Sequence, residues 1–254
     1  MKVILITQAR MGSSRLPGKV LMKVGGSSLL EMQLQRASKA KRVDKLIVAT
    51  SVKAEDSAIC KETNRLGIDC FRGNELDVLD RFYQAAKLEQ PDYVVRLTAD
   101  CPLIDPLVID AVIETAIDQD LDYCMNSLQE WFPDGQDTEV FKFSALERAW
   151  NEAEIGSERE HVTPYIFNNS IEKGGGFKVG SYDIEENLNH IRMTVDEQGD
   201  FDAIEVLVNE LGVNKGWREY TNFIVANPRR FTNQKIIRNE GYLKSLENDK
   251  SREH

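Results

Sequence analysis

Histidine and cysteine, the usual ligands of structural zinc, are scarce in this chain, whose 254 residues include three histidines and four cysteines. No two cysteines form a CxxC pair, so the pattern excludes a typical structural zinc site. We therefore interpret the cysteines as reduced thiols, most of them buried. They are Cys60, Cys70, Cys101 and Cys124.

Long apolar runs are also absent, and with them any candidate membrane span. Because Met1-Lys2 leads directly into the first apolar run, the sequence shows no leader pattern, and we expect a cytoplasmic protein. The chain has no positive balance either: its net charge is −10 and its pI is near 5.0. A protein that coats nucleic acid needs a broad basic surface, so we expect no nucleic-acid partner.

Acidic residues are missing before Glu31, although they outnumber basic residues in the whole chain. A short apolar run at residues 3–6 predicts a strand that ends in a basic loop. In this loop Gly12 and Gly18 let the backbone approach a ligand closely, and small serines offer donors. Guanidinium and ammonium groups neutralise phosphate oxygens. The loop therefore predicts a triphosphate site whose cations are Arg10, Arg15 and Lys19.

The loop has two other interpretations, a Walker P-loop and a simple turn. A Walker P-loop needs four residues between its glycines and a Ser or Thr after the lysine. Here five residues separate Gly12 from Gly18, and Val20 follows Lys19, which disfavours an ATPase or a kinase. The loop could also be a simple turn with solvated cations. We expect Lys19 to be exposed, so that its loss should affect turnover far more than stability.

Apolar runs and helical patterns alternate after the loop. The sequence predicts helices at 28–39, 54–66, 78–88 and from about 107, and strands at 43–50, 68–71 and 93–97. Such alternation predicts an α/β fold, a Rossmann-like three-layer arrangement with a mostly parallel sheet. Ligands of these sheets lie at the carboxyl ends of the strands.

Two carboxylates follow predicted strands. Asp100 comes just after the strand at 93–97, and residues 191–195 predict a strand that ends at Asp196. A lone aspartate at such a place often caps a helix or a turn, and Asp200 could do so for the next helix. If Asp100 and the basic loop open onto one crevice, however, magnesium explains a carboxylate beside phosphates best.

The stretches around Lys19, Asp100 and Asp196 together resemble those of the cytidylyltransferases that activate sugar acids as CMP-sugars. The similarity is closest to the spore-coat polysaccharide type, with acylneuraminate and deoxyoctulosonate enzymes as relatives. It implies a nucleotidyltransferase fold, CTP as donor and a Mg²⁺ cofactor held by Asp100 and Asp196. These two and Arg15 and Lys19 would be catalytic. The nucleotide-binding residues implied are Ala9, Arg10, Gly12, Ser13, Arg15, Lys19, Arg72, Asp77 and Thr98.

The alternation stops at residues 123–182, which predict a small inserted subdomain with strands at 139–143 and 177–182 and helices at 145–153 and 160–168. In the related enzymes this region binds the acceptor sugar and forms much of a dimer contact, so the resemblance implies a homodimer. The residues implied for the sugar are Asp137, Glu139, Glu160, His161 and Tyr165. Glu160 and Tyr165 could equally be solvated or packed helix residues, and a structural or hydrogen-bonding role for His161 is favoured over catalysis.

We expect one nucleotidyltransferase domain at residues 1–226 and a C-terminal tail at 227–254, whose Arg238 and Tyr242 could fold back on the domain or on a partner. The expected function is magnesium-dependent synthesis of a CMP-sugar from CTP and a sugar acid, for surface polysaccharide or glycan biosynthesis. A nucleotide-sugar-dependent glycosyltransferase is an alternative, but it usually carries an Asp-x-Asp pair, and here Pro102 stands two residues after Asp100. A non-catalytic nucleotide-binding regulator is another.

Overall fold

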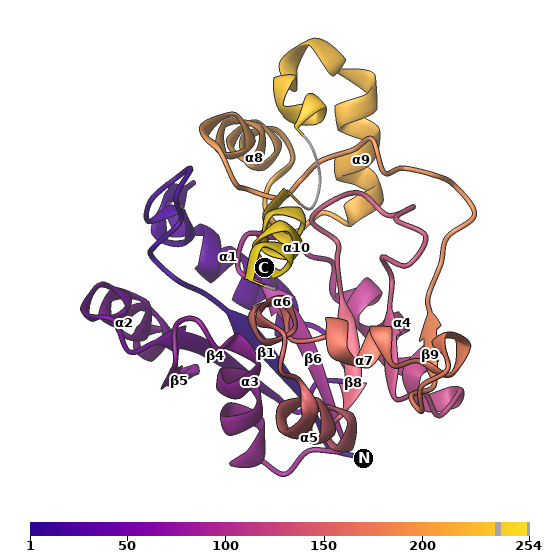
Figure 1. Ribbon diagram of the computed structural model, residues 1–254. Coiled ribbons are helices and arrows are strands. Elements are labelled where there is room, and N and C mark those ends of the chain that lie inside the picture. The colour runs from indigo at the N-terminus through magenta and orange to yellow at the C-terminus, as the bar shows by residue number, and fades with distance from the viewer. Residues whose placement is uncertain (237–239, 253–254) are drawn as a thin grey trace.

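The computed structural model describes residues 1–236 and 240–252, and its centre is a seven-stranded sheet (Figure 1). The strands of this sheet are β1 (Val3–Gln8), β4 (Lys45–Ser51), β5 (Asp69–Gly73), β6 (Tyr93–Thr98), β7 (Tyr123–Met125), β8 (Glu139–Lys142) and β9 (Val179–Ser181). A separate two-stranded ribbon consists of β2 (Lys23–Val24) and β3 (Ser27–Ser28).

Helices connect most of these strands. The α-helices are α1 (Leu29–Ala37), α2 (Ser57–Arg65), α3 (Val78–Lys87), α4 (Pro106–Asp118), α5 (Phe143–Glu152), α6 (Gly156–His161), α7 (Pro164–Asn168), α8 (Gln198–Leu211), α9 (Trp217–Ala226) and α10 (Glu240–Arg252). The short 3₁₀ helices are η1 (Lys19–Leu21), η2 (Ala54–Asp56), η3 (Ile171–Lys173), η4 (Pro228–Arg230) and η5 (Thr232–Lys235).

The sheet has the order β5-β4-β1-β6-β8-β7-β9 and is mostly parallel. Strand β1 pairs in parallel with both β4 and β6, and Leu5 lies opposite Leu46 on one side and Val95 on the other. Only β8 runs against its neighbours β6 and β7. The predicted α/β fold with a mostly parallel sheet is therefore confirmed.

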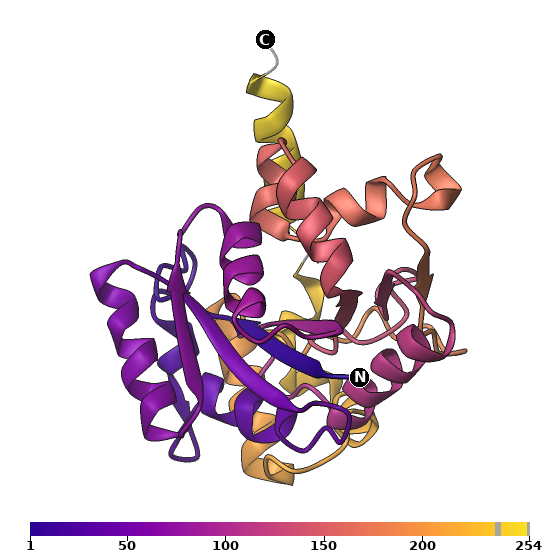
Figure 2. The same ribbon diagram turned by 90° about the horizontal axis from the view of Figure 1, so that it is seen from below.

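Successive residues of β1 point to opposite faces of the sheet. Helices cover both faces, so the fold has three layers. Val3 and Leu5 pack with α1, α4, α8 and α9, whereas Ile4 and Ile6 pack with α3 and α5. All four side chains are buried to 2% exposure or less, as expected of a strand covered on both faces. Figure 2 shows the sheet between these two helical layers.

Helices α1, α3 and α4 begin at residues that are good caps. The Ser28 hydroxyl accepts from the backbone N–H of Glu31 at the start of α1. Asp105 caps α4 with Pro106 in its first turn, and Asp77 caps α3. Each cap satisfies a backbone donor that the first helical turn leaves unpaired.

Two predicted elements differ from the structure. The helix predicted at 160–168 is broken into α6 and α7, because Val162 has a φ of 73° and Pro164 starts a new helix. Residues 191–195 do not form the predicted strand. They make a single bridge, between Arg192 and Asp134, because backbone hydrogen bonds join the two segments only around Asp134.

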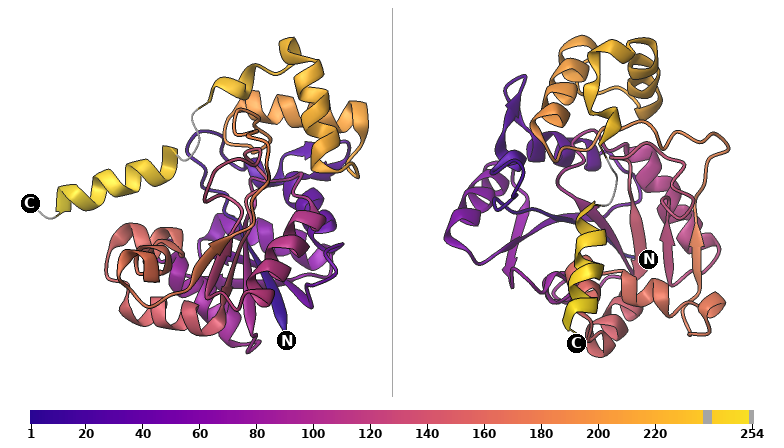
Figure 3. Two further views of the ribbon diagram at one scale, coloured as in Figure 1. Left: turned by 90° about the vertical axis from the view of Figure 1, so that its right-hand side faces the viewer. Right: turned by 45° about the horizontal axis from the view of Figure 1, so that its top comes forward.

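The region at 123–182, for which we expect an inserted subdomain, contributes β7, β8 and β9 to the main sheet and α5 and α7 to the layer of α3. In the expected tail, α10 packs against α6 and then extends away from the body (Figure 3). Arg238 and the other tail positions at 237–239 and 253–254 lie outside the described residues.

Two cysteines that are ten positions apart in the chain meet in space: the sulfurs of Cys60 in α2 and Cys70 in β5 lie 2.6 Å apart. Both are half-buried, whereas Cys101 and Cys124 are buried, so only two of the four thiols have the expected burial. None of the helices in the described ranges is long and apolar enough to cross a lipid bilayer.

Candidate active site

The basic loop after β1 is fixed by backbone contacts. The Met11 N–H donates to the buried carboxylate of Asp56 over 2.7 Å, and the Gly18 N–H donates to the Met11 carbonyl over 2.9 Å. Gly18 has a φ of 72°, a left-handed conformation that favours glycine. The loop is therefore folded back on itself and anchored to η2 before any ligand binds.

Lys19 follows this turn, and it is buried rather than exposed. Only 8% of the residue is accessible, which contradicts the expectation of an exposed strand-end lysine. The η1 turn directs its side chain inward, where the ammonium donates to the Val195 carbonyl over 2.6 Å and to Asp196 over 2.9 Å. It also lies 3.6 Å from Asp100. Burial lowers the pKa of Lys19, but these two carboxylates raise it by more, so the ammonium is charged.

Asp100 and Asp196 are therefore brought together at one cation although they are far apart in the sequence. The Val195 N–H donates to the Asp100 carbonyl over 2.8 Å, which ties the two segments to each other. Both side chains remain partly open, with exposures of 28% for Asp100 and 25% for Asp196. Burial raises the pKa of Asp196, but Lys19 and Arg192 lower it by more and keep the carboxylate ionised.

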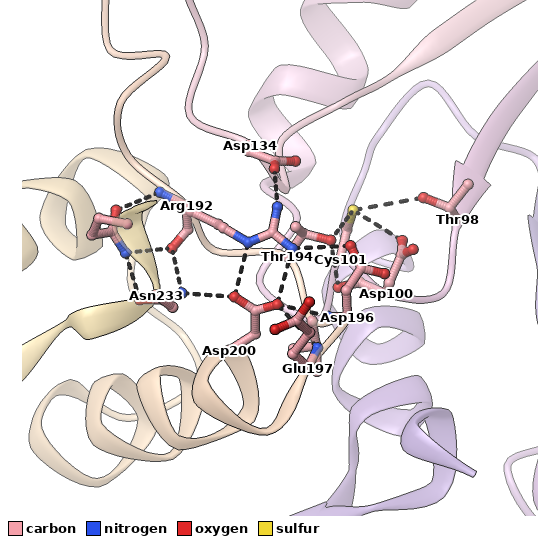
Figure 4. A network of polar contacts seen from close by, with 12 residues as sticks. Thr98, Asp100, Cys101, Asp134, Arg192, Thr194, Asp196, Glu197, Asp200 and Asn233 are labelled. Atoms are coloured by element: carbon pink, nitrogen blue, oxygen red, sulfur yellow. Dashed lines mark hydrogen bonds and ion pairs between the residues drawn. The ribbon is translucent and has the colours of Figure 1, made fainter. Parts of the chain in front are cut away.

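Behind Asp196 lies a second cluster, centred on Arg192 (Figure 4). Its guanidinium donates to Asp134 over 2.6 Å, to Asp196 over 2.9 Å and to both oxygens of Asp200 over 2.8 and 2.9 Å. Asp200 is fully buried, and Asn233 also donates to it. This cluster holds the segment at 191–196 against α8.

Asp200 lies in the first turn of α8 and forms a capping box with the N-cap residue Glu197, so it has the helix-capping role that the structural alternative predicted. It accepts from the backbone N–H groups of Asp196 and Glu197 over 2.9 and 3.1 Å. Burial raises the pKa of Asp200, but Arg192 and Asn233 lower it by more. With its oxygens enclosed by these donors, Asp200 presents no free face to a ligand.

Gly135 shows how closely the segment at 191–196 crosses the chain. Its φ is 104°, and a Cβ atom there would lie 2.7 Å from the carbonyl carbon of Met193. The two backbones exchange hydrogen bonds at this point, because Asp134 donates to Ile191 and Met193 donates to Asp134. A side chain at position 135 would therefore collide with the backbone of Met193 and Thr194.

Two cavities adjoin Asp100 and Asp196. One, of about 290 Å³, lies over the basic loop, and the other, of about 420 Å³, lies towards β7 and β8. Both are lined by the same five residues, which form their common wall: Arg15, Thr98, Asp100, His161 and Asp196. Arg15 belongs to this wall through contacts of 3.3 Å with Asp196 and 3.4 Å with Glu197.

The predicted nucleotide-binding residues divide into two groups. Those that line the smaller cavity are Ala9, Arg10, Ser13, Arg15, Lys19 and Thr98. Gly12 and Arg72 line neither cavity, and the Arg72 guanidinium instead donates to the Ser51 and Lys53 carbonyls at the end of β4. Asp77 pairs with Arg159 over 2.7 Å and faces a neighbouring cavity of about 360 Å³.

The predicted acceptor residues divide as well. Asp137, Glu139 and His161 line the larger cavity, whereas Glu160 lines the smaller one. Tyr165 lines neither, and its hydroxyl donates to Glu152 on the surface of α5. The structure therefore brings Asp137, Glu139 and His161 together and separates Tyr165 from them.

A model of the cytidylyltransferase family matches residues 4–233, nearly the whole length of the chain. The chain belongs to the cytidylyltransferases. This confirms the resemblance seen in the sequence and makes the protein a nucleotidyltransferase, an enzyme whose donor is CTP.

Similar proteins agree with this assignment. The cytidylyltransferase is 40% identical over 245 residues to an uncharacterized protein of Methanocaldococcus jannaschii, covering 95% of this chain and 98% of the other. It is 33% identical to the spore coat polysaccharide biosynthesis protein SpsF of Bacillus subtilis, over 83% of this chain and 88% of the other. A solved cytidylyltransferase from Leptospira borgpetersenii superposes with a TM-score of 0.87 at 31% identity, over 93% of this chain and 99% of the other.

Three residues of the cytidylyltransferase site were missed in the sequence. Arg96 of β6 pairs with Glu139 of β8 on the wall of the larger cavity, and an arginine inside an apolar strand was the signal for it. Arg81 of α3 lines the smaller cavity, where burial and repulsion from Arg10 lower its pKa to about 10. Lys244 reaches the same cavity from α10, and no local motif marks it.

The donor set suits magnesium better than zinc. Asp100 and Asp196 supply hard oxygen atoms close to one ammonium, and Mg²⁺ is commonly held by one or two carboxylates together with substrate phosphates. Within the described ranges, no three His, Cys, Asp or Glu side chains converge into a complete metal site. These residues therefore fit a magnesium ion that is completed by phosphate and water.

Proposed function

We propose that this cytidylyltransferase joins CTP and a sugar acid to give a CMP-sugar and pyrophosphate, with Mg²⁺ at Asp100 and Asp196. The observation that carries the proposal is the common wall between the two cavities. A group transfer needs donor and acceptor on either side of the reacting atoms, and Asp100 and Asp196 line both cavities.

The smaller cavity suits the triphosphate of CTP. Its wall combines Arg10, Arg81 and Lys19 with the small side chain of Ser13 and the backbone of the loop. Cations and loop N–H groups stabilise the charge that develops on the leaving pyrophosphate. We therefore assign this side of the wall to the donor.

The larger cavity suits a polyhydroxylated acid. Its polar lining includes Tyr123 and Thr163, whose hydroxyls both donate to Glu139, and Arg96, which pairs with Glu139. Burial raises the pKa of Glu139, but Arg96, Thr163 and Tyr123 lower it by more, which keeps the carboxylate ionised on the wall of this cavity. Arg15 and Arg96 provide positive charge for the carboxylate of the acceptor.

In the proposed reaction a hydroxyl oxygen of the acceptor bonds to the α-phosphorus of CTP. The bond from that phosphorus to the bridging oxygen of the β-phosphate breaks, pyrophosphate leaves, and the hydroxyl proton passes to solvent. Arg15 and Lys19 hold Asp196 and Asp100 in place and neutralise phosphate charge. Bound Mg²⁺ supplies further charge neutralisation at the phosphate oxygens.

The name of the Bacillus subtilis relative supports a role in surface polysaccharide biosynthesis, and we propose that the enzyme acts there as a homodimer. The pathway would consume the CMP-sugar as a glycosyl donor.

The test is to incubate the purified protein with Mg²⁺, each nucleoside triphosphate in turn, and a panel of ulosonic and nonulosonic acids. We expect pyrophosphate release with CTP and one class of acid, and a product with the mass of the CMP adduct. A glycosyltransferase would instead release a nucleotide from a nucleotide sugar. Pyrophosphate release that does not depend on any sugar acid would overturn the assignment of the acceptor.

A further inference from the structure

The C-terminal helix α10 presents one face to the active site. Tyr242, Ser245 and Asp249 are spaced three and four residues apart, so they lie on one side of the helix. All three contact α6: the Tyr242 ring and the Ser245 hydroxyl contact His161, and Asp249 accepts from the Ser157 N–H over 3.1 Å. On the other side, Leu243 is 51% exposed.

The same helix lines the cavities of the site. Lys244 lines the donor cavity and Tyr242 the acceptor cavity. Ser245 and Asp249 line the neighbouring cavity of about 360 Å³ together with Arg10 and Glu160. A helix far along the chain from the basic loop thus borders these three cavities. Figures 1 and 2 show α10 next to α6.

The contact between α10 and His161 involves a hydroxyl that also has a second partner. Ser245 Oγ lies 2.8 Å from the Tyr242 carbonyl, which accepts its single proton, and 2.9 Å from Nε2 of His161. Because a hydroxyl has one proton to give, a Ser245 that donates to this carbonyl accepts from His161, and Nε2 then carries the hydrogen. In the neutral ring Nδ1 then bears a lone pair. Among the described residues no hydrogen-bond partner of Nδ1 is found.

The ring of His161 lies where Nδ1 can meet a substrate. It belongs to the common wall of the donor and acceptor cavities. The edge of the ring packs against Tyr242, with centroids 5.0 Å apart and planes at 79°. The side chain is therefore held by α10 at both a polar and an apolar contact.

We propose that Ser245 and Tyr242 are positioning residues that fix His161 as the Nε2–H tautomer, so that Nδ1 accepts a hydrogen bond from a substrate hydroxyl where the two cavities meet. The hydrogen bond from a substrate hydroxyl to Nδ1 rests on the proposed function. The tautomer of His161 does not depend on that function. Burial, with repulsion from Arg96, lowers the pKa of His161 to about 4, which agrees with a neutral ring at pH 7.

The tautomer can be read directly by NMR. The chain has only three histidines, so long-range ¹H–¹⁵N spectra of protein labelled at histidine nitrogen contain few signals, and His161→Gln identifies the one that matters. We expect wild-type His161 to show the Nε2–H pattern from pH 5 to pH 8. An Nδ1–H pattern, or a charged ring at pH 7, would overturn the proposal without reference to any substrate.

Kinetics test the positioning. Ser245→Ala should turn the His161 signal into a mixture of tautomers and raise KM for the acceptor about three- to tenfold, with kcat changed by less than twofold. Ser245→Thr, which keeps the hydroxyl, should show the wild-type His161 signal and the wild-type KM for the acceptor. The matched control is Glu247→Gln, an exposed position of the same helix that lines none of these cavities.

Equal KM values for Ser245→Ala and Glu247→Gln would overturn the positioning role. If α10 detaches in the variant, the wild-type spectrum still decides the tautomer. An enzyme that makes no CMP-sugar but retains the Nε2–H pattern would contradict the proposed function while supporting the contact between α10 and His161, so the two failures are distinguishable.

Discussion

Two clusters of cations and carboxylates share Asp196, and they differ in how far they are closed. In the first, Lys19 contacts Asp100 and Asp196, whose side chains are about one-quarter exposed. In the second, the guanidinium of Arg192 is enclosed by Asp134, Asp196 and the fully buried Asp200. We call them the Lys19 cluster and the Arg192 cluster.

Within one short stretch of chain, the comparison distinguishes a carboxylate that can bind a ligand from one that stabilises the fold. Asp196 and Asp200 are four residues apart and carry the same carboxylate. Every oxygen of Asp200 is used inside the protein, whereas Asp196 still faces both cavities. Accessibility, and not charge, therefore marks the residue that can meet a ligand.

The largest expected effect concerns the open cluster. Asp100→Asn and Asp196→Asn should each lower kcat/KM about a thousandfold, because each removes a carboxylate from the proposed magnesium site. The double mutant should lose much less than the product of the two single losses, since the residues act as a unit. Pyrophosphate release at several Mg²⁺ concentrations measures this. Full activity of either single mutant at limiting Mg²⁺ would contradict a shared site, and multiplicative losses would show two independent roles.

Opening the closed cluster should instead cost stability. Asp200→Asn leaves a buried guanidinium with one partner fewer and should lower the free energy of unfolding by about 3 kcal/mol. Urea denaturation measures the loss, and Asp202→Asn, on the exposed side of α8, is the control. A change of less than 0.5 kcal/mol, within the range of ordinary surface substitutions, would show that the cluster is not a structural lock.

This cluster also predicts a pH dependence. The folded pKa of Asp200 lies below its ordinary value of 3.8, so its contribution is complete above that pH and is lost as the pH falls through the folded pKa. Thermal unfolding should therefore show a steeper loss of stability below about pH 4 for the wild type than for Asp200→Asn. Parallel curves for the two proteins would contradict this assignment.

A residue at the centre of the open cluster should affect both properties. Lys19→Ala should lower kcat/KM roughly ten- to a hundredfold, the effect of one lost charge-assisted contact. Because Lys19 is buried and also donates to Val195, we expect an accompanying loss of about 1 kcal/mol in stability. Lys23→Ala, an exposed lysine nearby, is the control. Unchanged kinetics in Lys19→Ala would exclude the proposed role in phosphate binding.

The smallest expected effect tests the geometry of the wall between the cavities. Arg15→Lys keeps the charge but loses the planar fork that contacts Asp196 and Glu197, so the Kd for CTP should rise about tenfold. Calorimetric titration with CTP measures this. Wild-type affinity would show that a point charge at position 15 is enough.

The sequence predicted the parallel part of the fold well because each element there is determined locally. Strand β1, the Ser28 cap and helix α3 follow from apolar periodicity and cap residues, and they appear near the expected bounds. The break between α6 and α7 was missed although Pro164 marks it, because the helical pattern continues past it.

The sequence predicted which residues form the site, but not which contacts these residues make with one another and with distant segments. Lys19, Asp100 and Asp196 stand beside one another in the structure, but the burial of Lys19 depends on the Val195 carbonyl, which comes from a segment distant in sequence. Likewise, nothing near Arg192 in the chain reveals that Asp134 will face it. Such contacts arise only when the chain folds, so local patterns cannot show them.

The common wall of the two cavities links their occupants thermodynamically. Arg15, Thr98, Asp100, His161 and Asp196 face both sides, so a molecule that reorients any of them on one side changes what the other side offers. By reciprocity, the factor by which the acceptor alters the affinity for CTP equals the factor by which CTP alters the affinity for the acceptor. Substrates that contact the same five residues are therefore expected to bind cooperatively or in a preferred order.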